Sequence, residues 1–374
     1  GYNYATSIFN HCSFLSEMPN GGLVLYSSKF KELSEMEKLK TAVLFPLRAG
    51  ESDLSALAGE YPFEFFLTPY LESTELRSSR GLNQGLNVEN IEEPLIPDSY
   101  RKVWAQCNSV IAMDLPTDTH NFFPDLKWVQ GVSAGHDHIN SNSLKSFDIR
   151  LTTAKGIASE AISEFVFARL LQEMKHLRRL DDQQHDRIWQ ARFGNQLKGK
   201  TIGIVGVGSI GKEIAKRAKA FEMKVIGVRK RIDLGIPRSV DLLYPFSDID
   251  ALLAESDFVV MAAPSTVETE NLFDASKFSK MKKGSIFVNI ARGIHVVESD
   301  LALHLASGHL RAAILDVVRN EPLEADNVLW TAPNLYLSPH CSVSFDDYER
   351  NAIDLFVKNA IRMFNGEELI NQEF

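Results

Sequence analysis

The sequence predicts an α/β protein with two domains, each built on a parallel β-sheet. The chain has 374 residues, and domains of about 150 residues are typical, so two domains are expected. Short apolar runs alternate with helical patterns from about Lys40 onward, as in strands joined by crossover helices. The alternation occurs twice, and a long segment with helical spacing of apolar residues, Glu160–His176, links the two runs.

The composition is that of a globular protein with an acidic balance of charge. Apolar residues make up 44% of the chain and charged residues 24%, close to the globular average. Asp and Glu total 49 against 40 Lys and Arg, and the resulting net charge of −9 opposes a general affinity for nucleic acids or anionic membranes. We therefore expect no nucleic acid and no membrane among its partners.

Cysteine usage and the first residues predict a cytoplasmic location. The three cysteines, Cys12, Cys107 and Cys341, are an odd number without short spacing, which excludes a disulfide framework and a CxxC metal site. No apolar run approaches the roughly 20 residues of a membrane span. Residues 1–28 contain no Lys or Arg, so they lack the charged start of a secretory signal.

The first domain is predicted to contain five strands in one parallel sheet. These strands are Thr41–Pro46, Phe63–Pro69, Ser109–Asp114, Lys127–Ser133 and Ile149–Ala154. Residues 1–40 carry only a weak strand signal and form an N-terminal extension without an assigned role. The polar, turn-rich segment Gly81–Glu93 is predicted to be a surface insertion.

The second domain is predicted to contain six strands, followed by a final helix. These strands are Thr201–Val205, Lys224–Val228, Phe258–Ala262, Ser285–Asn289, Ala312–Asp316 and Leu335–Leu337. The final helix is expected at about Phe345–Phe364, and periodicity alone does not say where it packs.

The motif Gly206-Val207-Gly208-Ser209-Ile210-Gly211 follows an apolar strand and precedes an amphipathic helix, Lys212–Phe221. The first glycine permits a tight turn, the second lets the backbone approach a pyrophosphate, and the third lets the helix pack on the strand. The N-terminal amides of the helix then face the anion. The second domain is therefore predicted to bind a dinucleotide.

The residue after the next strand favours NADP over NAD. In NAD-binding domains an acidic residue about 20 positions further on accepts hydrogen bonds from the ribose hydroxyls. Here Arg229, 23 positions after Gly206, stands at that place, and Lys230 and Arg231 follow it. Because a guanidinium group matches phosphate geometry, we expect NADP(H) to be preferred, with NAD(H) possible. A solvated basic turn is the alternative interpretation.

Polar residues follow three later strands of this domain. Arg292, Asp316, Glu321 and His340 lie just beyond apolar strands, at the edge where open α/β sheets bind ligands. Reduction of a 2-keto acid needs a fixed cation for the carboxylate and a proton donor for the carbonyl oxygen, roles that Arg292 and His340 can supply. A carboxylate such as Glu321 beside the histidine favours imidazolium. Taken singly, Arg292 could instead form a surface salt bridge, and His340 a strand-end cap.

Together these features resemble the D-isomer-specific 2-hydroxyacid dehydrogenase family, over roughly Lys40–Glu373. The matching segments also include Leu126–His138, which is similar to the family's substrate loop, and Pro264–Thr269, which is similar to a cofactor-side loop. The resemblance implies that Arg292, Glu321 and His340 are catalytic, and that the backbone of Ser133, Ala134 and Gly135 holds the substrate carboxylate. The implied cofactor contacts are Gly206, Gly208, Ser209, Ile210, Gly211, Arg229, Lys230, Arg231, Ala263, Pro264, Thr269, Ile290, Ala291 and Asp316, the last through the nicotinamide carboxamide.

The resemblance also implies a layout of two Rossmann-like domains with a cleft between them. Residues 41–172 and 341–374 would form a flavodoxin-like substrate domain, because the final helix returns to it, and residues 173–340 the dinucleotide-binding domain. Family members are commonly homodimers. The basic Arg229–Arg231 segment is most similar to NADP-preferring glyoxylate and hydroxypyruvate reductases, which predicts reduction of a short 2-keto acid to the D-2-hydroxy acid.

The sequence is also compatible with two other functions, and the roles of several histidines are not assigned. The chain could be an NAD(P)-sensing, corepressor-like binding protein on the same fold, or a dehydrogenase of a bulkier 2-hydroxy acid. His136 and His138 lie beside the substrate loop, where a satisfied polar contact is the favoured interpretation. No metal is expected, because the histidines of the second domain, His295, His304 and His309, lack a nearby carboxylate cluster.

Overall fold

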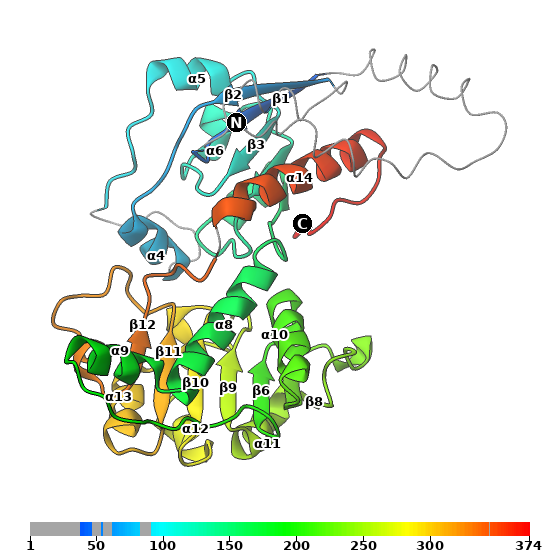
Figure 1. The fold of residues 1–374 in the computed structure, drawn as a ribbon. Coiled ribbons are helices and arrows are strands. Elements are labelled where there is room, and N and C mark those ends of the chain that lie inside the picture. The colour runs from blue at the N-terminus through cyan, green and yellow to red at the C-terminus, as the bar shows by residue number, and fades with distance from the viewer. Residues whose placement is uncertain (1–37, 47–53, 55–61, 83–90, 344) are drawn as a thin grey trace. The chain divides into compact units, whose positions relative to one another are not determined.

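The computed structural model describes residues 38–46, 54, 62–82, 91–343 and 345–374. The chain divides into two compact units (Figure 1). Unit 1 contains the described residues up to Ala154 together with Ala352–Phe374, and unit 2 contains Lys155–Asn351. Most of the predicted N-terminal extension and the middle of the predicted insertion lie outside the described residues. The predicted α/β class with two parallel sheets is confirmed.

Unit 1 is built on a five-stranded sheet in the order β2-β1-β3-β4-β5, and every neighbouring pair is parallel. This is the flavodoxin-like order, in which the chain changes direction between β1 and β3. The strands are β1 Leu39–Val43, β2 Phe63–Leu67, β3 Ser109–Ala112, β4 Trp128–Gly131 and β5 Arg150–Thr152. Each coincides with one predicted strand, although β1 begins and ends earlier than expected.

Helices and the last residues of the chain complete unit 1. The helices are α4 Thr74–Leu82, α5 Asp98–Trp104, α6 Thr119–Phe122, α7 Ser141–Ser146 and the larger part of α14 Phe345–Phe364. On the sheet, the ring of Trp128 stacks on Phe356 of α14 at a centroid distance of 4.9 Å. The segment after α14 runs along the edge strand β5, where Thr153 donates to the carbonyl of Asn371 and Glu373 donates to that of Leu151.

Unit 2 is built on a seven-stranded parallel sheet in the order β12-β11-β10-β9-β6-β7-β8. Its strands are β6 Thr201–Val205, β7 Lys224–Arg229, β8 Leu242–Pro245, β9 Phe258–Met261, β10 Ile286–Asn289, β11 Ala312–Leu315 and β12 Leu335–Leu337. Six of them were expected from the sequence. The order is that of a doubly wound dinucleotide-binding fold with one further strand, and the chain changes direction between β6 and β9.

Helices cover both faces of the unit 2 sheet (Figure 1). One face packs on α8 Ser159–Met174 and α10 Ser209–Ala220. The other packs on α11 Ile249–Glu255, α12 Ala275–Lys280 and α13 Glu298–Ala306. Because both faces are buried, the strands are almost continuously apolar, which is why short apolar runs identified them. None of the described helices is both long and apolar enough to cross a membrane.

The contact-based division between the units lies about one helix away from the predicted domain boundaries at residues 172/173 and 340/341. Helix α8 was expected in the first domain, but its residues pack in unit 2. The ring of Phe167 stacks on Phe221, after α10, at 5.2 Å. At the end of α8, Glu173 accepts hydrogen bonds from Arg311 and from Tyr336, at 2.8 and 2.7 Å. These contacts attach the whole helix to the second sheet.

Candidate active site

The predicted catalytic and cofactor residues converge on one edge of the unit 2 sheet. Since all its strands are parallel, their carboxyl ends lie together. The glycine motif follows β6, the basic residues lie at and just after the end of β7, and Ala263, Pro264 and Thr269 follow β9. Other predicted residues follow the last three strands: Ile290, Ala291 and Arg292 after β10, Asp316 and Glu321 after β11, and His340 after β12. The structure therefore brings these predicted residues to one edge of the sheet.

The glycine motif connects β6 to α10 and leaves room for an anion. Gly206 has φ +101°, and a Cβ there would lie 2.5 Å from the amide nitrogen of Ala263, so the loop closes tightly on the end of β9. A Cβ at Gly211 would overlap the carbonyl oxygen of Gly206. At Gly208, by contrast, a Cβ would meet no atom within 4 Å. The open space lies at the second glycine, so the first amides of α10 would hold the pyrophosphate of a bound dinucleotide.

The three basic residues after β7 have different surroundings. Lys230 pairs with Glu268 at 2.8 Å, and Arg231 pairs with Asp233 at 2.9 Å. Arg229 forms no ion pair with any described residue; one terminal nitrogen donates to the carbonyl of Gly235, and its buried Nε has no hydrogen-bond partner. A buried guanidinium nitrogen without an acceptor fits a site for an anionic group of the cofactor.

The loop after β9 is stabilised by its own side chains. The hydroxyl of Thr269 donates to the carbonyl of Pro264 at 2.9 Å and accepts from the amide of Thr266 at 2.8 Å. Thr269 is buried, and its carbonyl contacts Nδ1 of His295 at 3.0 Å. The threonine hydroxyl thus holds the loop shape, whereas Ala263 and Pro264 lie nearer the end of β9.

Asn289 and Gly293 shape the turn that carries Arg292. The side chain of Asn289 donates to the carbonyl of Arg292 at 2.8 Å and accepts from the amide of Ala291 at 3.1 Å. A Cβ at Gly293 would overlap the backbone of Val318 and Arg319. Only glycine permits this approach, so the turn after β10 packs directly against the loop after β11, which carries Glu321.

His340 and Glu321 form the pair that the sequence predicted. Nδ1 of His340 lies 2.9 Å from a carboxylate oxygen of Glu321, whose other oxygen accepts from the amide of Val318 at 3.3 Å. The glutamate is mostly buried, while the histidine side chain is 49% exposed. Because the carboxylate occupies Nδ1, Nε2 is the ring nitrogen that can exchange a proton with a substrate.

Asp316 is buried, and its carboxylate accepts three hydrogen bonds from the protein. One carboxylate oxygen accepts from the hydroxyl of Ser338 at 2.7 Å and the amide of Cys341 at 3.0 Å. The other accepts from the amide of Ser342 at 3.0 Å. These contacts were not expected, because the sequence offers no local pattern that connects residues 22 to 26 positions apart.

The predicted substrate loop lies in unit 1, after β4. The hydroxyl of Ser133 donates to the carbonyl of Gly135 at 2.6 Å, which folds the loop on itself. Among the described residues, the amides of Ala134 and Gly135 have no protein acceptor. Consecutive amides without acceptors form a concave site for a carboxylate. His138, nearby, is buried; its Nε2 contacts the carbonyl of Met113 at 2.7 Å, and burial lowers its pKa.

A charge network follows β2 and β3 in unit 1, and no sequence pattern predicted it. Arg80, 1% exposed, lies between Glu72 at 3.0 Å and Glu93 at 2.6 Å, and Tyr70 donates to Glu72 at 3.1 Å. Asp114 accepts two hydrogen bonds of 2.7 Å from Arg77. We define the Arg80 network as Tyr70, Glu72, Arg77, Arg80, Glu93 and Asp114. Arg80 directly precedes the predicted surface insertion and Glu93 ends it, so the ion pair between the buried arginine and the partly exposed glutamate joins the two ends of the insertion.

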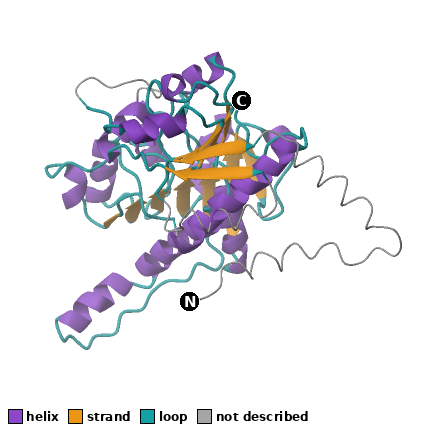
Figure 2. Cartoon of the chain, turned by 90° about the horizontal axis from the view of Figure 1, so that it is seen from above, coloured by secondary structure: helices purple, strands orange, loops and turns teal. Residues whose placement is uncertain are grey.

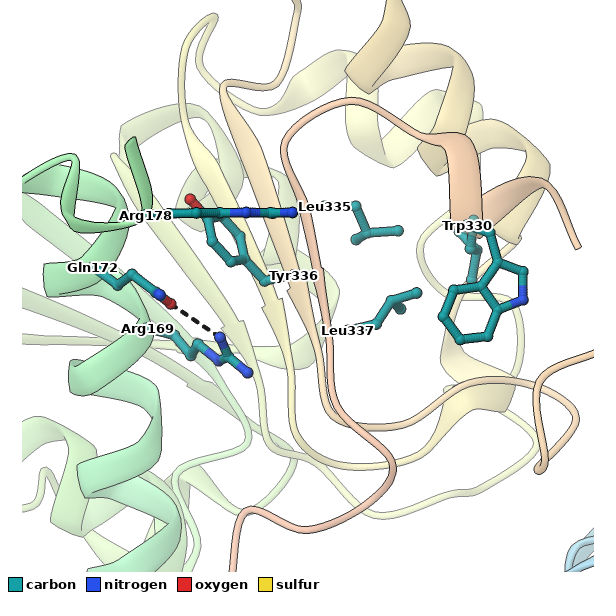
Figure 3. Close-up of a pocket in the computed structure, with 8 residues that line it drawn as sticks. Arg169, Gln172, Arg178, Trp330, Leu335, Tyr336 and Leu337 are labelled. Carbon is teal, nitrogen blue, oxygen red and sulfur yellow. Dashed lines mark hydrogen bonds between the residues drawn. The ribbon is translucent and has the colours of Figure 1, made fainter. Parts of the chain in front are cut away.

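Two further observations concern the described residues away from this edge. A cavity of about 340 Å³ in unit 2 is lined by polar side chains of α8 and α9 Leu177–His185 and by apolar residues around β12, with Arg169, Arg178 and Tyr336 among them (Figure 3). None of the predicted site residues lines it. No group of three or more His, Cys, Asp or Glu in the described ranges is placed to hold a metal ion.

Comparison with known proteins gives one family. The sequence model of the D-isomer specific 2-hydroxyacid dehydrogenase, NAD binding domain, matches residues 167–342. Glyoxylate reductase of Thermofilum pendens is 33% identical over 264 residues, which cover 67% of this chain and 76% of the relative. Glyoxylate/hydroxypyruvate reductase B of Klebsiella pneumoniae is 32% identical over 287 residues, covering 75% and 88%.

A solved structure extends the match to almost the whole fold. The D-isomer specific 2-hydroxyacid dehydrogenase family protein from Aeromonas salmonicida is 31% identical and superposes with a TM-score of 0.72, covering 90% of this chain and 99% of that protein. The family expectation from the sequence is thereby confirmed, and with it a nicotinamide dinucleotide as cofactor. The chain belongs to the D-isomer specific 2-hydroxyacid dehydrogenase family and is an NAD(P)-dependent enzyme.

Proposed function

We propose that this enzyme reduces a short 2-keto acid, such as glyoxylate or hydroxypyruvate, to the D-2-hydroxy acid. The observation that carries the proposal is the pair of His340 and Glu321, 2.9 Å apart, on the same sheet edge as the open glycine loop. Relatives at 32–33% identity are named glyoxylate reductase and glyoxylate/hydroxypyruvate reductase, which supports a small substrate.

His340 acts as the general acid in this proposal. Its Nε2 donates a proton to the carbonyl oxygen of the keto acid, while Glu321 holds Nδ1 and stabilises the charged ring. The nicotinamide, when bound, supplies the hydride. Arg292, on the adjacent turn, binds the carboxylate and polarises the carbonyl group of the substrate. The free amides of Ala134 and Gly135, with Ser133, bind the carboxylate of the substrate through the backbone.

NADPH is the preferred cofactor in this proposal, with NADH as a weaker alternative. Arg229 ends β7, where a carboxylate would select NAD, and it forms no ion pair with a described residue. Its buried Nε fits the 2′-phosphate, so it would hold that group in a fork geometry. Lys230 and Arg231 contribute charge from a more exposed position and must release or share their acidic partners.

A homodimer is part of the proposal. The loop that follows α9 exposes large apolar side chains: Ile188 is 52% exposed, Phe193 is 89% exposed, and Trp189 is fully exposed. In Figure 2 this helix and loop extend away from the strands. Several large apolar groups on one projecting segment are typical of a surface that is covered in an oligomer. Sedimentation of the wild type and of Trp189→Ser, which should shift towards monomer, tests this.

The first experiment measures oxidation of NADPH and NADH at matched concentrations with glyoxylate, hydroxypyruvate, pyruvate and phenylpyruvate. We expect turnover of the two small acids with NADPH and a kcat/KM at least tenfold lower with NADH, because Arg229 would lose its phosphate partner. Equal kcat/KM for both cofactors would contradict the NADP assignment. Turnover of phenylpyruvate alone would replace the small substrate with a bulkier one. Tight NADPH binding without turnover of any acid would contradict the proposed function and favour a sensor.

A further inference from the structure

The segment Ser338–Ser342, which carries His340, is fastened to a single buried residue. Asp316 receives hydrogen bonds from Ser338, Cys341 and Ser342 through its two carboxylate oxygens, at 2.7, 3.0 and 3.0 Å. Its backbone carbonyl accepts a fourth, from the amide of His340, at 2.8 Å. Asp316 is 1% exposed, so water does not compete for these donors.

The backbone conformation of His340 explains why the segment requires these hydrogen bonds to Asp316. His340 has φ +52°, in the left-handed region that residues other than glycine rarely adopt. Such a conformation persists only where the surroundings impose it. Here the residues on both sides of His340 are bound to the same carboxylate. The left-handed turn directs the imidazole so that Nδ1 reaches Glu321 at 2.9 Å.

We propose that Asp316 is a positioning residue that acts on the reaction through His340, in addition to any contact with the cofactor. This inference rests on the proposed role of His340 as general acid. An ionised carboxylate suits this positioning role because both of its oxygens accept hydrogen bonds. The three groups that contact it, one hydroxyl and two backbone amides, are all donors. An asparagine has one accepting oxygen and one donating nitrogen, so it cannot satisfy all three donors.

The test compares Asp316→Asn with Ser338→Ala, which removes one donor to Asp316 while leaving the carboxylate in place. We expect Asp316→Asn to lower kcat by about 10- to 100-fold and Ser338→Ala by a smaller factor, because a misplaced general acid slows proton transfer. The binary Kd of NADPH, measured by its fluorescence, should stay within threefold in Ser338→Ala, and in Asp316→Asn it should change by a smaller factor than kcat. A role limited to the nicotinamide would instead weaken NADPH binding in proportion to the loss of kcat/KM.

Two double cycles identify the group through which Asp316 acts. In a His340→Gln background, Asp316→Asn should cause almost no further loss, because the residue it positions is absent. With the 3-acetylpyridine analogue of NADPH, which lacks the carboxamide nitrogen, Asp316→Asn should cause the same fold-loss as with NADPH. Full additivity with His340→Gln, together with no effect in the presence of the analogue, would overturn the inference.

A measurement without turnover separates this inference from the proposed function. In protein labelled with ¹³C-histidine, the signals of His340 are those missing from His340→Gln. These signals should shift or broaden in Asp316→Asn and Ser338→Ala, and unchanged signals in both variants would overturn the inference. If the wild type reduces none of the acids tested while these shifts occur, the proposed function fails and the positioning of His340 by Asp316 stands.

Discussion

Each unit has a sheet edge formed by the carboxyl ends of its strands, β2 and β3 in unit 1 and β6 to β12 in unit 2. We call the edge of unit 2 the open edge and that of unit 1 the closed edge, because buried charged side chains fill the second. Both lie beside a point where the chain changes direction across a parallel sheet, a place that commonly binds ligands. In unit 2 the edge keeps open space at Gly208 and a half-exposed His340. In unit 1 the Arg80 network fills the corresponding edge, and Arg80 and Glu72 are each 1% exposed.

The comparison of the two sheet edges shows that strand order alone does not make a ligand site. The residues at the edge determine whether a ligand can bind there. Unit 2 places glycine and free backbone amides at its edge, which a dinucleotide can satisfy. Unit 1 places cations and carboxylates that pair with one another, with Arg80 between Glu72 and Glu93. Among the described residues, one oxygen of Glu72 and Nε of Arg80 are buried without a hydrogen-bond partner, but no glycine loop opens this edge to a ligand as at Gly208. Only the loop after β4, with the free amides of Ala134 and Gly135, keeps the ligand-binding character in that sheet.

The largest expected effect is on the open edge. His340→Ala removes the proton donor, and kcat/KM should fall by about 10²- to 10⁴-fold, which is the usual contribution of a general acid. Steady-state kinetics with NADPH and the best acid provides the measurement. His185→Ala, at the exposed end of α9, is the matched control and should keep wild-type kinetics. A loss of only a few fold in correctly folded His340→Ala would remove the general-acid assignment.

The second largest effect is expected for a substitution in the Arg80 network of unit 1. Arg80→Met leaves the buried Glu72 and the partly exposed Glu93 without their shared cation, and the free energy of unfolding of unit 1 should fall by about 3–5 kcal/mol. Denaturant unfolding followed by tryptophan fluorescence measures it, with Lys102→Met, an exposed residue of α5, as the control. NADPH binding should survive at low denaturant because it belongs to unit 2. Equal midpoints for the two variants would show that the network contributes nothing.

A smaller effect concerns the pH dependence of the closed edge. Burial raises the pKa of Glu72 to about 7, and Arg80 opposes this shift. A raised folded pKa stabilises the fold at pH values below the unfolded pKa of about 4.5, and this contribution is lost as the pH rises through 7. Glu72→Gln also removes a partner of Arg80, so the pH dependence is the informative quantity. Between pH 4.5 and pH 8 the stability of this variant relative to the wild type should rise by about 1–3 kcal/mol. Glu75→Gln, exposed on α4, should follow the wild type at both pH values.

The smallest effect sharpens the cofactor assignment at the open edge. Glu268→Gln frees Lys230 from an exposed ion pair of 2.8 Å, so the lysine can approach the 2′-phosphate. Exposed pairs contribute at most about 1 kcal/mol, so the Kd of NADPH should fall by about two- to fivefold, with that of NADH unchanged. Fluorescence titration measures both, and Glu270→Gln provides an exposed control. A parallel change for NADH would place Lys230 away from the phosphate.

The sequence predicted the parts of the fold that depend on short-range patterns. Buried strands such as β6 and β9 are continuous apolar runs, and Gly206 and Gly211 of the β6–α10 turn are required by the close backbone around them. Strand β8 was missed, because it is a short, half-buried edge strand that ends in Pro245. The sequence indicated helix α8 as a link between the domains but not which sheet it packs on, since periodicity shows that a face is buried without identifying its partner.

The site was predictable to the same extent. Strand ends located Arg292, Glu321 and His340, because parallel strands bring their carboxyl ends to one edge. The fastening of Ser338–Ser342 to Asp316 and the Arg80 network were not predictable. Both join residues distant in the chain, and charged residues such as Arg80 and Glu93 are indistinguishable in sequence from solvated ones.

The residues that run along β5 have a protective consequence. A strand at the border of a sheet presents unpaired amide and carbonyl groups, which can recruit a strand from another molecule and start aggregation. Asn371 and Glu373 pair with the backbone of Thr153 and Leu151, and Gln372 forms an antiparallel bridge with Thr152. A deletion of residues 370–374 would therefore leave the sites in unit 2 intact while turning the border of unit 1 into a template for self-association.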